Sequence, residues 1–179
     1  MFQKLRKISG FLKILPVKSR YTLLELNSMT NTKFQLAIRY ILVASLAKSI
    51  GDNVYIGKNT TFKNLNRISI GNNVSIHDLC YIDGYGKINI GDNVSIAHNS
   101  SILSTNHTWK DTDLPIKYNP VERGKVVIGN DVWIGCGVRL LSNISIGQRS
   151  VVAAGSVVNR DVESNSVYAG VPAKKIKDI

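Results

Sequence analysis

The chain has 179 residues, of which 44% are hydrophobic and 20% are charged, and this composition fits one soluble domain with a hydrophobic core. It excludes disordered, collagen-like and low-complexity classes, and the longest charge-free apolar stretch, 40–47, is too short to span a bilayer. The first 18 residues have the basic flank of a secretory signal, but Lys13 interrupts the apolar part and no small-residue cleavage site follows. We therefore expect a cytoplasmic protein.

The net charge of +11 is concentrated at one end of the chain. Residues 1–49 contain nine Lys or Arg against one acidic residue, Glu25, and so carry +8 of the total. The other 130 residues are nearly neutral, which argues against a nucleic-acid partner for the main body. Any anionic surface that the protein meets is expected to contact the N-terminal segment.

Residues 1–49 are predicted to be helical. Leu5, Ile8, Leu12 and Leu15 fall on one face of a first helix, and a second helix over about 33–48 leads into the next part of the chain. One interpretation is a cap that covers the open end of a repetitive fold. A second, compatible interpretation is a basic amphipathic segment that rests on an anionic membrane or glycolipid surface.

From residue 50 the chain follows a repeat of six residues. A helix cannot satisfy this period, because at 100° per residue each equivalent position moves 120° from the last. Short strands joined by tight turns do satisfy it, and three hexads close one triangular coil that stacks on the next. Fifteen hydrophobic positions obey the rule: Ile50, Ile56, Phe62, Ile70, Ile76, Ile82, Ile90, Ile96, Ile102, Ile128, Ile134, Leu140, Ile146, Val152 and Val158.

The coil starts, near 50, 70, 90, 128 and 146, predict about five coils. Glycine often follows the hydrophobic residue, as expected at a tight turn where a Cβ would clash. The interval between the third and fourth starts is 20 residues too long, so about 105–125 is expected to form a loop extruded from the stack. In a repetitive fold such a polar loop is where specific chemistry is expected.

The hexad pattern and three stretches of sequence together resemble the hexapeptide-repeat acyltransferases. The stretches are SILSTNHTW, IGNDVWIGCGVRLLSNISIGQRSVVAAGSVV and YAGVPAKKIK. The resemblance covers about residues 50–177 and is strongest to the maltose and galactoside O-acetyltransferases and to their capsule- and lipopolysaccharide-modifying relatives. It implies a left-handed parallel β-helix, a homotrimer with active sites between subunits, and acetyl-CoA as donor. We expect a helical cap over 1–49, the β-helix over 50–167 and a basic C-terminal tail over 168–179.

His107 in the extruded loop matches the family's catalytic histidine. An imidazole can remove the proton of an acceptor hydroxyl near neutral pH and then return a proton to the leaving thiolate. His77 stands where such sugar acetyltransferases often carry an asparagine that contacts the acceptor, and Asp83, one hexad later, is a weaker candidate for the same pocket. His77 could instead be an ordinary exposed residue at a corner of the coil.

The resemblance also implies a set of donor-binding residues. Trp133 matches a tryptophan beside the acetyl-donor cleft, with plain trimer packing as the alternative, and Cys136 supplies a backbone N–H, without a nucleophilic role. Ala154, Gly155, Asn159 and Arg160 match the stretch that lines the pantetheine arm. Lys174, with Lys175 beside it, matches the basic segment that meets the nucleotide phosphates of coenzyme A. The set comprises Trp133, Gly135, Cys136, Ala154, Gly155, Asn159, Arg160, Lys174 and Lys175.

No metal site is predicted. The two cysteines, Cys80 and Cys136, lack the spacing of a zinc knuckle and cannot form a disulfide framework, and Cys80 is expected to be a core thiol. His77, His98 and His107 do not have the spacing of the zinc-binding histidines in related β-helix carbonic anhydrases.

The preferred function is transfer of an acetyl group from acetyl-CoA to a sugar hydroxyl in the synthesis of a surface polysaccharide or glycolipid. Acetylation of an amino group on a nucleotide sugar, acetylation of another small molecule and a non-catalytic β-helix scaffold remain open alternatives.

Overall fold

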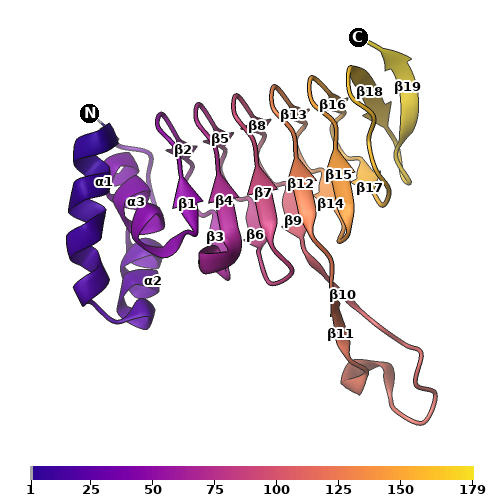
Figure 1. Cartoon of the computed structure of the whole chain (residues 1–179), viewed down its shortest axis with the longest axis horizontal. Coiled ribbons are helices and arrows are strands. Elements are labelled where there is room, and N and C mark those ends of the chain that lie inside the picture. Colours follow the sequence, from indigo (N-terminus) through magenta and orange to yellow (C-terminus); the bar gives the residue numbers. More distant parts are fainter. Residues whose placement is uncertain (1) are drawn as a thin grey trace.

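The six-residue repeat folds into three parallel sheets that form the sides of a prism. The computed structural model describes residues 2–179, in which about six coils of β-helix follow three α-helices (Figure 1). Side A consists of β1 (Ser49–Ile50), β4 (Ile68–Ile70), β7 (Ile88–Ile90), β12 (Val126–Ile128) and β15 (Ile144–Ile146).

The other two sides are also parallel, except that the last strand of side B, β19, is antiparallel to its neighbour. Side B consists of β2 (Tyr55–Ile56), β5 (Ser75–Ile76), β8 (Ser95–Ile96), β13 (Trp133–Ile134), β16 (Val151–Val152), β18 (Ser166–Ala169) and β19 (Lys174–Asp178). Side C consists of β3 (Thr61–Lys63), β6 (Tyr81–Asp83), β9 (Ser101–Leu103), β14 (Arg139–Leu140) and β17 (Val157–Val158).

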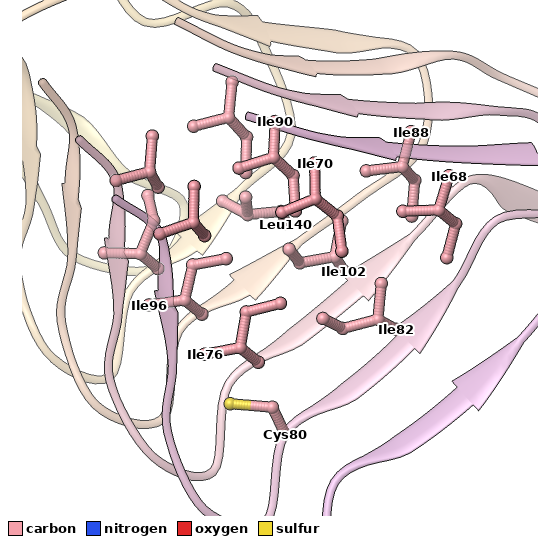
Figure 2. Packing of buried hydrophobic residues seen from close by; sticks show 14 of the residues in the cluster. Ile68, Ile70, Ile76, Cys80, Ile82, Ile88, Ile90, Ile96, Ile102 and Leu140 are labelled. Atoms are coloured by element: carbon pink, nitrogen blue, oxygen red, sulfur yellow. The ribbon is translucent and has the colours of Figure 1, made fainter. Parts of the chain in front are cut away.

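The hydrophobic residues of the hexads pair with one another from coil to coil and fill the prism. On side B, Ile56 pairs with Ile76 and Ile76 with Ile96. Figure 2 shows such residues from all three sides meeting in the interior, with the Cys80 thiol at one edge of the cluster. Of the fifteen predicted core positions, fourteen are buried, and Ile50 is half-buried where the helices join the first coil. Burying a large aliphatic side chain contributes roughly 1.5–3 kcal/mol.

The turns depend on asparagine as well as glycine. Asn53, Asn73 and Asn93 occupy equivalent turn positions in successive coils, with positive φ angles of 53°, 53° and 58°. Asparagine tolerates this left-handed conformation better than most residues do. The Nδ2 of Asn53 donates to Asn73 Oδ1 at 3.1 Å, and Asn73 donates to Asn93 at 3.0 Å, so the turns are also tied along the prism.

The N-terminal segment forms three α-helices, one more than the sequence predicts. They are α1 (Phe2–Phe11), α2 (Val17–Leu26) and α3 (Lys33–Leu46), with a short 3₁₀ turn, η1 (Leu12–Ile14), after α1. The expected apolar face of the first helix is only partly correct, because Leu5 and Leu12 pack on the core whereas Ile8 and Leu15 are exposed. Figure 1 shows the helices covering one end of the coil stack. No helix within residues 2–179 is long and apolar enough to cross a membrane.

Three of the N-terminal basic residues are occupied by internal contacts. Arg39 is 1% exposed, and its Nε donates to the carbonyl oxygen of Ile56 at 2.9 Å, which joins α3 to the first coil. Arg20 is buried and donates to the carbonyl oxygen of Ser45, and Arg6 pairs with Asp52. The exposed basic residues of this segment are therefore lysines: Lys4, Lys7, Lys13, Lys18, Lys33 and Lys48.

The C-terminal end adds an incomplete sixth coil. Val162 bridges to Ile146, and β18 continues side B beyond β16. Strand β19 then folds back antiparallel on β18. The segment expected to begin a basic tail at residue 168 is thus part of a sheet in the structure.

Candidate active site

The extruded segment is an ordered arm rather than an irregular loop. It leaves the stack after β9 and consists of β10 (Thr105–His107), a 3₁₀ turn, η3 (Ile116–Tyr118), and β11 (Val121–Arg123). Strands β10 and β11 pair antiparallel, with His107 opposite Val121. Figure 1 shows the arm projecting sideways from the stack. His107 is exposed on this arm, where its imidazole is accessible to a substrate.

The end of the arm is held by one buried asparagine. Asn119 is 4% exposed, and its Nδ2 donates to the carbonyl oxygens of Asp111 and Leu114 at 3.0 and 3.2 Å. Its Oδ1 accepts from the amide of Asp111 at 3.0 Å. These hydrogen bonds satisfy the buried side-chain amide of Asn119, whose burial without partners would be unfavourable. They also hold together the connection between the two strands. The ordered connection between β10 and β11 thereby helps to fix the position of His107.

The base of the arm depends on close backbone contact. The amide of Gly124 donates to the carbonyl oxygen of Ser104 at 2.9 Å, and the amide of Gly86 donates to Ser104 Oγ at 2.8 Å. A Cβ at Gly86 would lie well inside contact distance of the Ser104 carbonyl oxygen and 2.7 Å from the Gly124 amide nitrogen. Sequence reasoning missed Gly86, although a glycine outside the hexad register beside the insertion is a usable signal.

The two predicted acceptor-binding residues, His77 and Asp83, lie before and at the end of β6, on different edges of the prism. Asp83 ends β6 and pairs in register with Leu103, which ends β9 two residues before the arm begins. Its Oδ1 accepts from Asn64 Nδ2 at 2.8 Å and from the amide of Tyr85 at 3.1 Å. His77 instead lies exposed in the turn before β6, with its ring centroid 5.5 Å from that of Tyr55. Within one chain, Asp83 is on the same edge of the prism as the arm and His77 is not.

A second group of predicted residues gathers along the edge between sides B and C. The amide of Gly155 donates to the carbonyl oxygen of Cys136 at 2.8 Å, so these two turns stack directly. A Cβ at Gly135 would lie 2.6 Å from the amide nitrogen of Ala154. The backbones of the two turns approach so closely that only glycine fits at this position. Among the backbone hydrogen bonds of residues 2–179, none is donated by the amide of Cys136 or of Ala154. We call this group, Gly135, Cys136, Ala154 and Gly155, the turn column.

Trp133 precedes the turn column on side B. It points outward from β13, between Ser95 and Val151 in register, and its side chain is 55% exposed. A large aromatic residue left on an outer face usually has a partner. Within one chain the turn column and Trp133 therefore lie away from the edge between sides C and A, where the arm that carries His107 leaves the stack.

Asn159 and Arg160 lie apart from the turn column, on the edge of the prism from which the arm projects. Asn159 lines a cavity of about 230 Å³ together with Asn106, the neighbour of His107, and Ser142. Arg160 follows it as an exposed residue. Asn159 thus shares a cavity with the neighbour of the catalytic candidate and not with the residues of the turn column.

The two C-terminal lysines differ in their surroundings. Lys175 Nζ lies 2.6 Å from Glu163 Oε2 and 2.8 Å from Asp178 Oδ1. These hydrogen bonds, to Asp178 first and then Glu163, raise the pKa of Lys175. Lys174 is exposed on β19, with no carboxylate within 4.0 Å in the described part of the chain. Both lysines remain predicted contacts of the donor.

No cluster of three or more His, Cys, Asp or Glu side chains suited to a metal ion occurs between residues 2 and 179. The thiol of Cys80 is buried, and burial raises its pKa to about 11. Cys80 is therefore a core residue, as predicted, whereas Cys136 is half-buried.

Comparison with known proteins supports the class of protein that this fold and arm define. The family described as "Bacterial transferase hexapeptide (six repeats)" matches residues 125–160. A solved galactoside acetyltransferase in complex with coenzyme A is 30% identical and superposes with a TM-score of 0.81 over 91% of this chain and 80% of that chain. A hexapeptide-repeat acetyltransferase of Vibrio cholerae O1 biovar eltor, solved with acetyl-CoA, is 28% identical, with a TM-score of 0.80 over 90% of this chain and 86% of that one.

The fold and the matches define a β-helical transferase. The chain belongs to the hexapeptide-repeat acetyltransferases. Among the curated relatives, a putative lipopolysaccharide biosynthesis O-acetyl transferase, WbbJ of Escherichia coli (strain K12), is 39% identical over 80 residues, which are 45% of this chain and 41% of that protein. The chain spans less than half the length of the first curated relatives that it matches.

Proposed function

We propose that this protein is an acetyl-CoA-dependent O-acetyltransferase that modifies a sugar hydroxyl during the synthesis of a surface polysaccharide or glycolipid. The observation that carries the proposal is the superposition on coenzyme A-bound acetyltransferases over nine-tenths of the chain, together with an exposed histidine on an ordered arm. The alternatives are an N-acetyltransferase of an amino sugar, an acetyltransferase of another small molecule and a non-catalytic scaffold.

The proposed reaction is a direct transfer with His107 as general base. The imidazole removes the proton of the acceptor hydroxyl while that oxygen attacks the thioester carbonyl of acetyl-CoA. The tetrahedral intermediate collapses, the carbon–sulfur bond breaks, and the imidazolium returns the proton to the coenzyme A thiolate. The products are an acetyl ester and free coenzyme A.

The turn column is suited to stabilise the charge that develops on the carbonyl oxygen. The amides of Cys136 and Ala154 have no acceptor within the described chain, and both lie in turns of small residues that a substrate can approach closely. Preorganised backbone donors of this kind stabilise an oxyanion strongly. Cys136 acts through its amide, so its thiol is dispensable.

A homotrimer would bring the two groups of residues together. In one chain His107 and the turn column lie on different edges of the prism, so the base of one subunit is proposed to act on a thioester held against its neighbour. His77 and Trp133, which also lie away from the arm, would reach the site from that neighbour. Mixed oligomers of His107→Ala and Gly155→Trp subunits should regain activity that each variant lacks alone.

The N-terminal end is suited to contact an anionic membrane on which a glycolipid acceptor lies. Phe11, Ile14 and Val17 are 74%, 86% and 54% exposed around the connection between α1 and α2, and the exposed Lys13 and Lys18 flank them. Exposed apolar side chains with adjacent lysines are typical of interfacial segments. These features support a proposed location of the enzyme on the cytoplasmic side, at the inner face of the membrane.

The test is incubation with acetyl-CoA and a panel of sugars, nucleotide sugars and lipid-linked glycans, with release of free thiol as readout. We expect acetylation of at least one acceptor, and the product should lose its acetyl group in mild base because it is an ester. A base-stable product would indicate N-acetylation. A non-catalytic scaffold would release no thiol, and acetyl-CoA would not raise its stability. An enzyme that binds acetyl-CoA should be stabilised by about 2.7 kcal/mol when the ligand is at 100 times its dissociation constant.

A further inference from the structure

Two arginines meet on one tyrosine at the base of the arm. The Cζ of Arg123, from β11, lies 4.3 Å from the centroid of the Tyr85 ring, and its Nη2 donates to the Tyr85 hydroxyl at 2.8 Å. The Cζ of Arg67 lies 5.5 Å from the same centroid, and its Nη1 donates to the Tyr85 carbonyl oxygen at 2.7 Å. Arg67 ends the 3₁₀ turn η2 (Leu65–Arg67), one coil before Tyr85. We call Arg67, Tyr85 and Arg123 the arginine cluster.

The positive charge of this cluster is not balanced from within the chain. Over residues 2–179, no carboxylate lies within 4.0 Å of either guanidinium. The neighbouring Glu122 is paired with Lys110 at 2.9 Å, and Asp83 Oδ1 accepts from Asn64 and from the amide of Tyr85. Each guanidinium has five N–H donors, and these contacts with Tyr85 use one from each. Most of the donors therefore remain available to an external oxyanion.

The cluster lies on the same face of the arm as the catalytic candidate. Arg123 pairs in register with Thr105, and His107 is two residues further along the same strand. In an antiparallel pair, directly opposed residues and those two positions along share one face, with diagonal neighbours roughly 7–8 Å apart. The side chains of Arg123 and His107 thus project from one side of the ribbon, whereas Asn106 and Glu122 project from the other.

We propose that the acceptor is anionic and that Arg123 and Arg67 bind a phosphate or carboxylate group close to the hydroxyl that is acetylated. This inference rests on the proposed function, because it takes His107 as the base. Guanidinium groups bind both kinds of oxyanion through paired hydrogen bonds, and Tyr85 holds the two arginines in place. A sugar whose hydroxyl contacts His107 would present its charged substituent to the cluster.

The test measures binding, so it does not depend on knowing the natural acceptor. Galactose, galactose 1-phosphate and galacturonic acid are titrated calorimetrically into the wild-type protein. At least one charged sugar should bind ten-fold or more tightly than galactose. Comparison of the two charged sugars distinguishes a phosphate from a carboxylate ligand. Equal affinities for all three, or no measurable binding of either charged sugar, would overturn the proposal.

Variants then assign the preference to the cluster. Arg123→Gln and Arg67→Gln should each weaken binding of the charged sugar by about ten-fold and leave binding of galactose unchanged. Arg149→Gln is the matched control, because Arg149 is an exposed arginine away from the arm whose Nη1 lies 3.8 Å from Asp131. A charge preference that survives both cluster variants, or that falls equally in the control, would contradict the assignment.

The failure of this inference is distinguishable from failure of the proposed function. If neutral and charged sugars are acetylated with the same kcat/KM, the anionic acceptor is wrong and the acetyltransferase stands. If charged sugars bind through the cluster but no acceptor of any charge releases thiol from acetyl-CoA, the acetyltransferase is wrong and the oxyanion site stands.

Discussion

The amide of Gly124 donates to the carbonyl oxygen of Ser104 at 2.9 Å, and this bond closes the base of the arm that carries His107. Gly86 fits beneath it only because it has no side chain. The placement of His107 therefore depends on a backbone contact several residues away from the imidazole.

Gly86→Ala should displace the arm and lower kcat by about ten-fold or more, since small misplacements of a catalytic group are costly. The coils themselves should stay folded. Steady-state kinetics together with circular dichroism checks both statements.

Gly10→Ala is the matched control for that substitution, because no heavy atom lies within 4 Å of a Cβ built there. It should leave kcat unchanged. Normal kcat in Gly86→Ala would show that the arm does not need this close approach.

The buried thiol of Cys80 should make stability fall in alkaline solution. Its pKa is raised by burial from 9.0 to about 11, so above pH 9 the unfolded chain releases a proton that the folded chain retains. Unfolding is therefore favoured progressively from pH 9 to pH 11, by about 2–3 kcal/mol at the upper end.

Urea unfolding at a series of pH values measures this effect, and Cys80→Ala isolates it from the tyrosines whose pKa values are also raised by burial, Tyr21, Tyr40 and Tyr55. The variant should be less stable at pH 8 but lose less stability on going to pH 11. Parallel pH profiles for the two proteins would refute the account of the thiol.

Removal of the exposed apolar residues should abolish membrane contact without unfolding the protein. Phe11→Ser with Ile14→Ser should reduce sedimentation with vesicles that contain anionic phosphatidylglycerol, because apolar area and charge act together at an interface. The wild type should bind these vesicles more weakly as salt increases.

Phe34→Ser is the control for this pair, because Phe34 is also 74% exposed but lies at the start of α3. It should bind the vesicles as the wild type does. Wild-type binding by the double variant, or equal binding to neutral vesicles, would rule out the proposed contact.

The repeat was sufficient to predict the prism because it constrains both burial and pairing. Ile76 and Ile96, twenty residues apart, could be placed in register from spacing alone. The sixth coil escaped detection because Val158 and Val162 are separated by four residues instead of six, although Val162 and Tyr168 resume the period.

The N-terminal helices were harder to predict because tertiary contacts decide their orientation. Helix α2 has little amphipathic periodicity, and the buried Ser9 replaces the expected Ile8 on the core side of α1. Arg39 adds to the positive charge of the N-terminal segment in the sequence, but its guanidinium donates to three backbone carbonyl groups inside the protein. A sequence pattern does not show such a buried hydrogen-bonding role.

The six-residue period is enough to show that some of the predicted site residues lie far apart in one chain. His77 and Asp83 are six residues apart, which is one full side of the prism, so a single chain cannot place them in one pocket. The arm could not be predicted in the same way, because Thr105, Asn106 and His107 show no hydrophobic alternation. Their strand is defined by pairing with β11 and by the buried Asn119.

The most direct test of the account compares two exposed histidines, His107 on the arm and His98 in a turn of the third coil. With the best acceptor from the panel, His107→Ala should lower the rate of thiol release from acetyl-CoA by roughly 10²- to 10⁴-fold. His98→Ala should retain wild-type turnover, and acetyl-CoA should stabilise both variants as it does the wild type. Full turnover in His107→Ala, or the same loss in both variants, would contradict a mechanism in which the arm supplies the base.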